Sequence, residues 1–355
     1  MTDATPAKSR VVIGHRRESR RANLSVSQYI EGILGGDRWI LAKAITLVES
    51  SHEADREMAA EILEMYLRRS EHRIVVGVTG VPGAGKSSLI EVLGKHIITT
   101  CDEKVAVLAV DPSSSLSGGS ILGDKTRMPF LASSEMAFIR PSPSRGRLGG
   151  VAEHTRDAIV LCEASGYRNV LIETVGVGQS ETTVRGMVDF FLLVAIAGAG
   201  DELQGIKRGV MEMADAVAVN KTDGDNVRQA EKARGDVENA LHFLPLSASG
   251  WSPRALTCSA RTGLGVEQIW SSVLEHHKVI SQTGFLKRTL REQNLRWLHE
   301  SVERGVMRVF QSSPIVQQRF AEVEKQVAAG QMTPLAAARL LLSGWRLHGE
   351  DNQGK

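Results

Sequence analysis

The sequence predicts an α/β fold in which a mostly parallel sheet is flanked by helices. Three observations support this. Short apolar, β-rich runs alternate with helical stretches from Ile74 to about Lys278. Fully apolar runs such as 190–196 suit strands that are buried on both faces. At 355 residues, 42% of them hydrophobic, the chain can form one large α/β domain with appendages or two domains.

The expected strands are short and regularly separated. In chain order their sequences are IVVGV, VAVLAV, MAFI, VLIE, FFLLVAI, AVAV and ALTC. Neighbouring parallel strands need a crossover connection, which a helix usually supplies. We therefore expect a helix between most pairs of these runs, within a domain that spans residues 73–280.

Ahead of the sheet we expect a small helical unit over residues 24–72. Apolar residues recur there at helical spacing, for example Met58, Ile62 and Tyr66. Residues 1–23 lack this periodicity and are expected to form a flexible basic arm. The arginines in that arm favour a solvated tail, with a transit segment or an anion-binding tail as alternatives. These arginines are Arg16, Arg17, Arg20 and Arg21.

After the sheet, residues 281–347 are expected to form a helical arm, followed by a polar tail over 348–355. Leu298, Val302 and Val306 recur every four residues on a long, charged helix. Because the sheet is already complete, this apolar stripe needs another surface to cover it. A twofold homodimer is the simplest cover, and packing against the N-terminal helices is the alternative.

Composition excludes several classes of protein. Lys and Arg total 43 against 41 Asp and Glu, so bulk charge does not predict nucleic-acid binding. Cys101, Cys162 and Cys258 lie far apart, which fits neither a disulfide framework nor a zinc site. No run reaches the ~18 apolar residues of a membrane helix. We therefore expect a soluble protein of the reducing cytoplasm, with neither nucleic acid nor membrane as a partner.

The first expected strand runs directly into a phosphate-binding loop. Residues 80–87 match the pattern GxxxxGK[ST] at every fixed position. Backbone N–H groups of such a loop surround a phosphate, the lysine reaches the β- and γ-phosphates, and the serine hydroxyl binds Mg²⁺. The predicted nucleotide-binding residues here are Gly80, Val81, Pro82, Gly83, Ala84, Gly85, Lys86, Ser87 and Ser88. This is the P-loop of a nucleoside triphosphatase.

The base is predicted from the motif NKxD, which follows the strand AVAV. Its residues are Asn220, Lys221 and Asp223. The Asp223 carboxylate can accept hydrogen bonds from guanine N1–H and the 2-amino group, whereas adenine has no donor at either place. After the next strand, Ser259, Ala260 and Arg261 resemble the motif whose backbone contacts guanine O6. We therefore predict that the ligand is GTP or GDP.

Carboxylates that could bind Mg²⁺ lie between these motifs. Glu173 ends the strand VLIE, where small GTPases carry the Asp of Asp-x-x-Gly. Asp111 and Asp124, at and after the end of the strand VAVLAV, are further candidates. Val177 occupies the position of the water-orienting Gln of Ras-type enzymes. Intrinsic hydrolysis is therefore expected to be slow.

With these motifs together, the sequence resembles the MeaB/ArgK-type GTPases, which are chaperones associated with methylmalonyl-CoA mutase. The resemblance covers about residues 24–347. It rests on the segments GVPGAGKSSL, AVDPSSSLSGGSILGDKTRM, ETVGVGQSE, GDELQGIKRGVMEMAD and NKTD.

The resemblance has further implications. It implies a G domain of the SIMIBI class, a C-terminal dimerisation arm, and a role in loading or protecting the adenosylcobalamin of an acyl-CoA mutase, above all methylmalonyl-CoA mutase. Asp111, Asp124 and Glu173 then correspond to Mg²⁺ and switch carboxylates, and Lys207 to the lysine of a mobile third switch.

Two other functions stay open. A P-loop kinase or transport-linked NTPase corresponds to an older interpretation of the ArgK-type proteins, but a kinase does not need the guanine-selective NKTD. A metal-insertion GTPase needs clusters of thiolates or imidazoles. The cysteines here are scattered, and the adjacent pair His276 and His277 is more typical of a helix surface.

Overall fold

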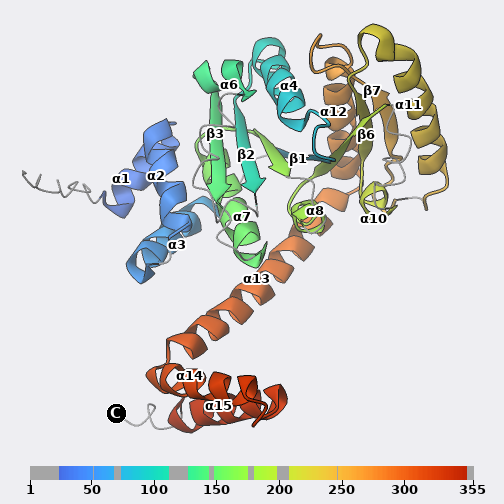
Figure 1. Ribbon diagram of the computed structural model, residues 1–355. Coiled ribbons are helices and arrows are strands. Elements are labelled where there is room, and N and C mark those ends of the chain that lie inside the picture. Colours follow the sequence, from blue (N-terminus) through green and yellow to red (C-terminus); the bar gives the residue numbers. More distant parts are fainter. Residues whose placement is uncertain are drawn as a thin grey trace, which may run out of the picture.

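The computed structural model describes residues 24–50, 52–67, 73–111, 127–143, 148–174, 180–197, 208–245 and 247–349 (Figure 1). The predicted basic arm over 1–23, Asp124, Val177 and Lys207 lie outside these ranges. The backbone of Asp111 is described, but its side chain is not. Among the described residues, none of the helices combines the length and the apolar character needed to cross a membrane.

The centre of the molecule is a seven-stranded sheet in the order β3-β2-β4-β1-β5-β6-β7. All of its neighbouring strands are paired in parallel, as predicted. Each of the apolar runs in the sequence forms one strand. The strands are β1 (Ile74–Gly80), β2 (Val105–Asp111), β3 (Ala137–Pro143), β4 (Asn169–Thr174), β5 (Phe190–Ile196), β6 (Ala216–Asn220) and β7 (Arg254–Thr257).

Helices cover both faces of the sheet. On one face, α4 (Lys86–Cys101) and α12 (Val266–Gln282) share a core with Val76 and Val78 of β1. On the other, α7 (Leu148–Ala164) and α8 (Ser180–Arg185) share a core with Val75. Successive residues of β1 thus enter different cores, which explains why its sequence is apolar without alternation. Further helices among the described residues of this region are α6 (Pro129–Ser133), α10 (Arg208–Glu212), a 3₁₀ turn over Gly224–Asn226 and α11 (Val227–His242).

The N-terminal helices extend the core on the α7 face. They are α1 (Val26–Leu34), α2 (Arg38–Val48) and α3 (Glu53–Leu67). Ser25 and Gln28 form a capping box at the start of α1, and the Asp37 carboxylate caps α2. Ile33, Leu41 and Ile62 of these helices are buried in the same cluster as Val170 of β4. The unit is therefore packed onto the sheet domain through α7, as Figure 1 shows.

The C-terminal part is a long helix that ends in a helical hairpin. Helix α13 (Phe285–Ser312) leads away from the sheet, and α14 (Pro314–Ala328) and α15 (Pro334–Gly349) form the hairpin at its far end (Figure 1). Only Gln293 and Phe310 of α13 are buried. Helix α14 was not expected from the sequence as a separate helix, and α15 continues through His348 to Gly349, beyond the predicted end of the arm at residue 347.

Candidate functional site

The P-loop connects β1 to α4 and depends on glycine at two positions of close approach. Gly80 has φ 147°, and a Cβ there would lie 2.1 Å from the Val194 carbonyl oxygen of β5. Gly85 has φ 86°, and its Cβ would lie 2.6 Å from Asn220 Nδ2. No other residue type fits either place without movement of the backbone or of the guanine motif. The backbone N–H groups of the loop lie beside the first turn of α4, a favourable place for a phosphate.

Lys86, the first residue of α4, is only 8% exposed. Its ammonium donates hydrogen bonds to the carbonyl oxygens of Gly80, at 2.7 Å, and Val81, at 3.3 Å. Burial lowers the pKa of Lys86, while the negative charges of Glu173 and Glu181 act in the opposite direction. The lysine is therefore held over the loop, where a bound phosphate could take the place of the carbonyl groups.

The hydroxyl and carboxylate predicted to bind Mg²⁺ are in direct contact. Ser87 Oγ donates to Glu173 Oε1 over 2.6 Å. Glu173 is brought there by the pairing of β4 with β1, in which it lies opposite Val78. On the other side of β4, the pairing with β2 places the backbone of Asp111 at the same edge of the sheet. Hydroxyl and carboxylate oxygens are ligands that Mg²⁺ prefers.

The structure adds Glu181, which the sequence analysis did not propose as a site residue. It lies in the first turn of α8 and is 3% exposed, and its charge acts on the pKa of Lys86. The available signal was its position in the segment ETVGVGQSE, as a second carboxylate eight residues after Glu173. Two carboxylates therefore act on the P-loop lysine, from different elements.

Asn220 joins the phosphate-binding and guanine motifs. Its Nδ2 donates to the Ala84 carbonyl oxygen over 2.8 Å, and its Oδ1 accepts from the Ala260 N–H over 3.0 Å. The Cys258 thiol also donates to Oδ1, at 3.7 Å. Burial raises the pKa of Cys258 to about 12, so the thiol keeps its proton. Asn220 thus fixes the position of the P-loop relative to the guanine motifs.

Asp223 lies beside the second guanine motif. The fully buried Ser259 donates from Oγ to Asp223 Oδ2, and Ser259 Oγ accepts from the Thr262 N–H over 3.2 Å. One carboxylate oxygen is thereby oriented by the protein. Lys221 has φ 64°, which turns the chain sharply after β6. Arg261 is exposed and makes no hydrogen bond or ion pair with the described residues.

The structure corrects the interpretation of the histidine pair. His276 is 3% exposed and packs edge-on against Phe190 and Trp251, each with ring centroids 5.2 Å away. Burial is the main cause that lowers the pKa of His276 to about 3, so the ring is neutral. It is therefore a core residue rather than a surface one. Within the described ranges, no group of three or more His, Cys, Asp or Glu side chains could hold a metal ion.

Comparisons with known proteins agree with this site. The family model described as methylmalonyl-CoA mutase-associated GTPase MeaB matches residues 41–314. A probable GTPase of Mycobacterium tuberculosis is 47% identical over 310 residues, which are 87% of this chain and 92% of that protein. GTPase ArgK of Escherichia coli is 46% identical over 283 residues, which are 80% of this chain and 85% of that protein.

A mouse protein and a solved structure extend the comparison. The mitochondrial methylmalonic aciduria type A homolog of Mus musculus is 43% identical, over 90% of this chain and 80% of that protein. A crystal structure described as LAO/AO transport system kinase has a TM-score of 0.69 and 36% identity, and the match covers 90% of this chain and 97% of that one. The family model, the related sequences and the fold agree, and the chain belongs to the family of methylmalonyl-CoA mutase-associated GTPases, MeaB.

Proposed function

We propose that this protein is a GTP-hydrolysing chaperone that controls the loading or protection of adenosylcobalamin in an acyl-CoA mutase, with methylmalonyl-CoA mutase as the client. GTP hydrolysis follows from membership of a GTPase family. The client is supported by the name of that family and by the relatives named for methylmalonic aciduria type A. The free thiols of Cys101, Cys162 and Cys258 support a reducing cytoplasm as the compartment.

The observation that carries the proposal is the meeting of the P-loop, the Glu173 carboxylate and the guanine motifs at one edge of the sheet. Ser87 Oγ and Glu173 Oε1 are 2.6 Å apart, so one ion could contact both. We propose that they hold Mg²⁺, with Asp111 and Asp124 contributing directly or through water. The ion would neutralise charge on the phosphates.

The other functions of the site are assigned to separate residues of the protein. Lys86 binds the β- and γ-phosphates, and Asp223 recognises the guanine edge, with Ser259 holding its carboxylate. Because Val177 cannot orient the attacking water, turnover is slow without a partner. Lys207 is proposed as the mobile lysine of a third switch that responds to the client.

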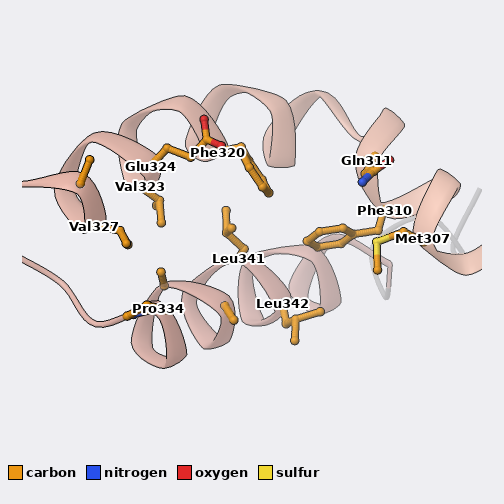
Figure 2. Close-up of a pocket in the computed structure, with 13 residues that line it drawn as sticks. Met307, Phe310, Gln311, Phe320, Val323, Glu324, Val327, Pro334, Leu341 and Leu342 are labelled. Carbon is orange, nitrogen blue, oxygen red and sulfur yellow. The ribbon is translucent and has the colours of Figure 1, made fainter. Parts of the chain in front are cut away.

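Assembly is proposed through the arm. A groove of about 790 Å³ lies between the end of α13 and the hairpin of α14 and α15, and apolar side chains make up most of its lining. Figure 2 shows Phe310, Val323 and Leu341 pointing into it. Leu298, Val302 and Val306 continue this apolar surface along α13 and are each at least half exposed. A second copy of the chain is the proposed cover.

The client is tested by reconstitution. Purified methylmalonyl-CoA mutase is mixed with this protein, and cobalamin transfer is compared with GTP, with a non-hydrolysable analogue and with Lys86→Ala. We expect efficient transfer only with GTP and the unchanged protein. Identical transfer in all three conditions, without a complex or a change in the hydrolysis rate, would contradict the proposed client and leave a GTPase of another pathway.

A further inference from the structure

We propose that the hydroxyl pair of Thr79 and Thr174 positions Glu173 against Ser87, and so sets the affinity of the site for Mg²⁺. The pair lies on the face of the sheet opposite Ser87. The inference rests on the function proposed above, because it concerns the Mg²⁺ used in GTP hydrolysis. Both threonines are positioning residues, since their side chains lie on the face of the sheet away from α4, which carries Lys86 and Ser87.

The pair joins the ends of two neighbouring strands. Thr174 Oγ1 lies 2.9 Å from Thr79 Oγ1 and 3.5 Å from the Val78 carbonyl oxygen. Both side chains are 1% exposed. Thr79 directly precedes Gly80, where the P-loop begins, and Thr174 directly follows Glu173. The two hydroxyls therefore join the strand that leads into the phosphate-binding loop to the strand that presents the carboxylate.

Alternation along the strands places this contact behind the site. A Cβ on Gly77 would lie 3.0 Å from a Val184 methyl group of α8, so α8 covers that face of β1, and Thr79 shares the face. Thr174 likewise shares a face with Ile172, which belongs to the same core. Glu173 points the other way, toward Ser87 at the start of α4. The end of β4 is thus held by Thr174 on one face of the sheet, while the Glu173 carboxylate lies on the other face, next to Ser87.

Two buried hydroxyls are otherwise unexpected here. Valine has nearly the same shape as threonine, is favoured in buried parallel strands and carries no polar group to desolvate. Among the described residues, the only hydrogen bond of the Thr79 side chain is the one with Thr174. A hydrogen-bonded hydroxyl pair fixes both the distance and the relative orientation of the two strand ends, which two valine side chains cannot do.

The experiment compares Thr174→Val, Thr174→Ser and Thr79→Val with a matched control. The control is Thr155→Val in α7, which removes a buried hydroxyl that has no hydrogen-bond partner among the described residues. Three quantities are measured for each full-length protein: GTP hydrolysis against free Mg²⁺, affinity for a fluorescent GDP in EDTA, and the thermal midpoint.

We expect Thr174→Val to raise the Mg²⁺ concentration for half-maximal hydrolysis by roughly five- to tenfold, the scale of one lost hydrogen bond. GDP affinity in EDTA should not change. Thr174→Ser restores the hydroxyl and should restore the Mg²⁺ dependence, and Thr155→Val should match the wild type. Thr79→Val leaves Thr174 its contact with Val78 and should give a smaller shift in the same direction. It provides the test if Thr174→Val does not fold.

The inference fails if Thr174→Val and Thr79→Val keep the wild-type Mg²⁺ dependence. A lower thermal midpoint with an unchanged Mg²⁺ dependence would give the pair a merely structural role and would also contradict the inference. Mg²⁺-independent hydrolysis by the wild type would contradict the proposed Mg²⁺ site itself, which separates the two failures.

Discussion

Asn220 illustrates how one side chain can serve two motifs. In the sequence it belongs to the guanine motif, yet its amide nitrogen donates to Ala84 in the P-loop and its oxygen accepts from Ala260. The amide is used on both sides, so neither aspartate nor alanine reproduces it. Its 1% exposure shows that it contributes to the framework of the site.

Asp223 is predicted to determine the choice of base. Replacing Asp223 with alanine removes the carboxylate that pairs with guanine, so the preference for GTP over ATP should disappear. Isothermal titration calorimetry with GDP, GTP and ATP measures this directly. Asp225→Ala, two residues away in the 3₁₀ turn, is the control and should keep the preference. Equal affinity of the wild type for ATP and GTP would contradict the guanine site and restore the kinase alternative.

Asp189 is predicted to make stability depend on pH. Burial raises the pKa of this carboxyl, which accepts a hydrogen bond from the Val75 N–H, to about 6. Its unfolded pKa is about 3.9. The folded state therefore binds the proton more tightly, and the Asp189 contribution to the free energy of unfolding falls as pH rises from about 4 to about 6. Above that range it is constant.

The test compares wild type with Asp189→Asn in urea unfolding between pH 4 and 7. His276 has the opposite sign, because its pKa is lowered to about 3 from an unfolded value of about 6.5, so its contribution falls as pH decreases. Both proteins carry His276, and the difference between them isolates Asp189. Parallel pH profiles for the two proteins would show that folding does not raise the pKa of Asp189.

At the level of elements, apolar runs and glycine motifs predicted the sheet and the nucleotide loop because each has a local cause. A strand buried on both faces needs a continuous apolar run, as in β5, and a P-loop needs glycine where the backbone approaches β5 and Asn220. Both causes are visible in a short window of sequence.

Other features depend on contacts that no short window contains. His276 and His277 are adjacent in sequence but about 100° apart around a helix, so α12 buries one of them. Glu181 acts on Lys86 only because α8 follows β4 back to the P-loop. The hydroxyl pair of Thr79 and Thr174 requires the register between β1 and β4. Tertiary pairing, rather than propensity, determines each of these.

The arm is predicted to hold two copies together. Val302 is 55% exposed in the single chain, so Val302→Glu should leave the fold intact and convert a dimer into a monomer. Light scattering on the full-length protein measures the mass. Glu303→Gln, an exposed neighbour on α13, is the control and should stay dimeric. A truncation before Gln282 that remains dimeric would show that the arm is not the interface.

At the scale of the whole molecule, nucleotide and client must influence each other equally. If bound GTP changes the affinity for the mutase by some factor, the mutase must change the affinity for GTP by the same factor. We expect a factor of about 5–150, the usual range of such coupling. Calorimetry measures the affinity for a non-hydrolysable GTP analogue with and without mutase, and the affinity for mutase with and without the analogue. A factor of one would mean that the nucleotide does not signal to this client.

The order of the strands has a consequence for how such a protein can change. β1 lies near the middle of the sheet, with the carboxylate-bearing β4 on one side and β5, β6 and β7 leading to the guanine motifs on the other. The choice of base and the handling of the terminal phosphate thus belong to opposite halves of the sheet. Substitutions in one half should combine additively with those in the other. Evolution could therefore adjust the duration of the GTP-bound state without altering which nucleotide is bound, provided that Asn220 keeps its link to the P-loop.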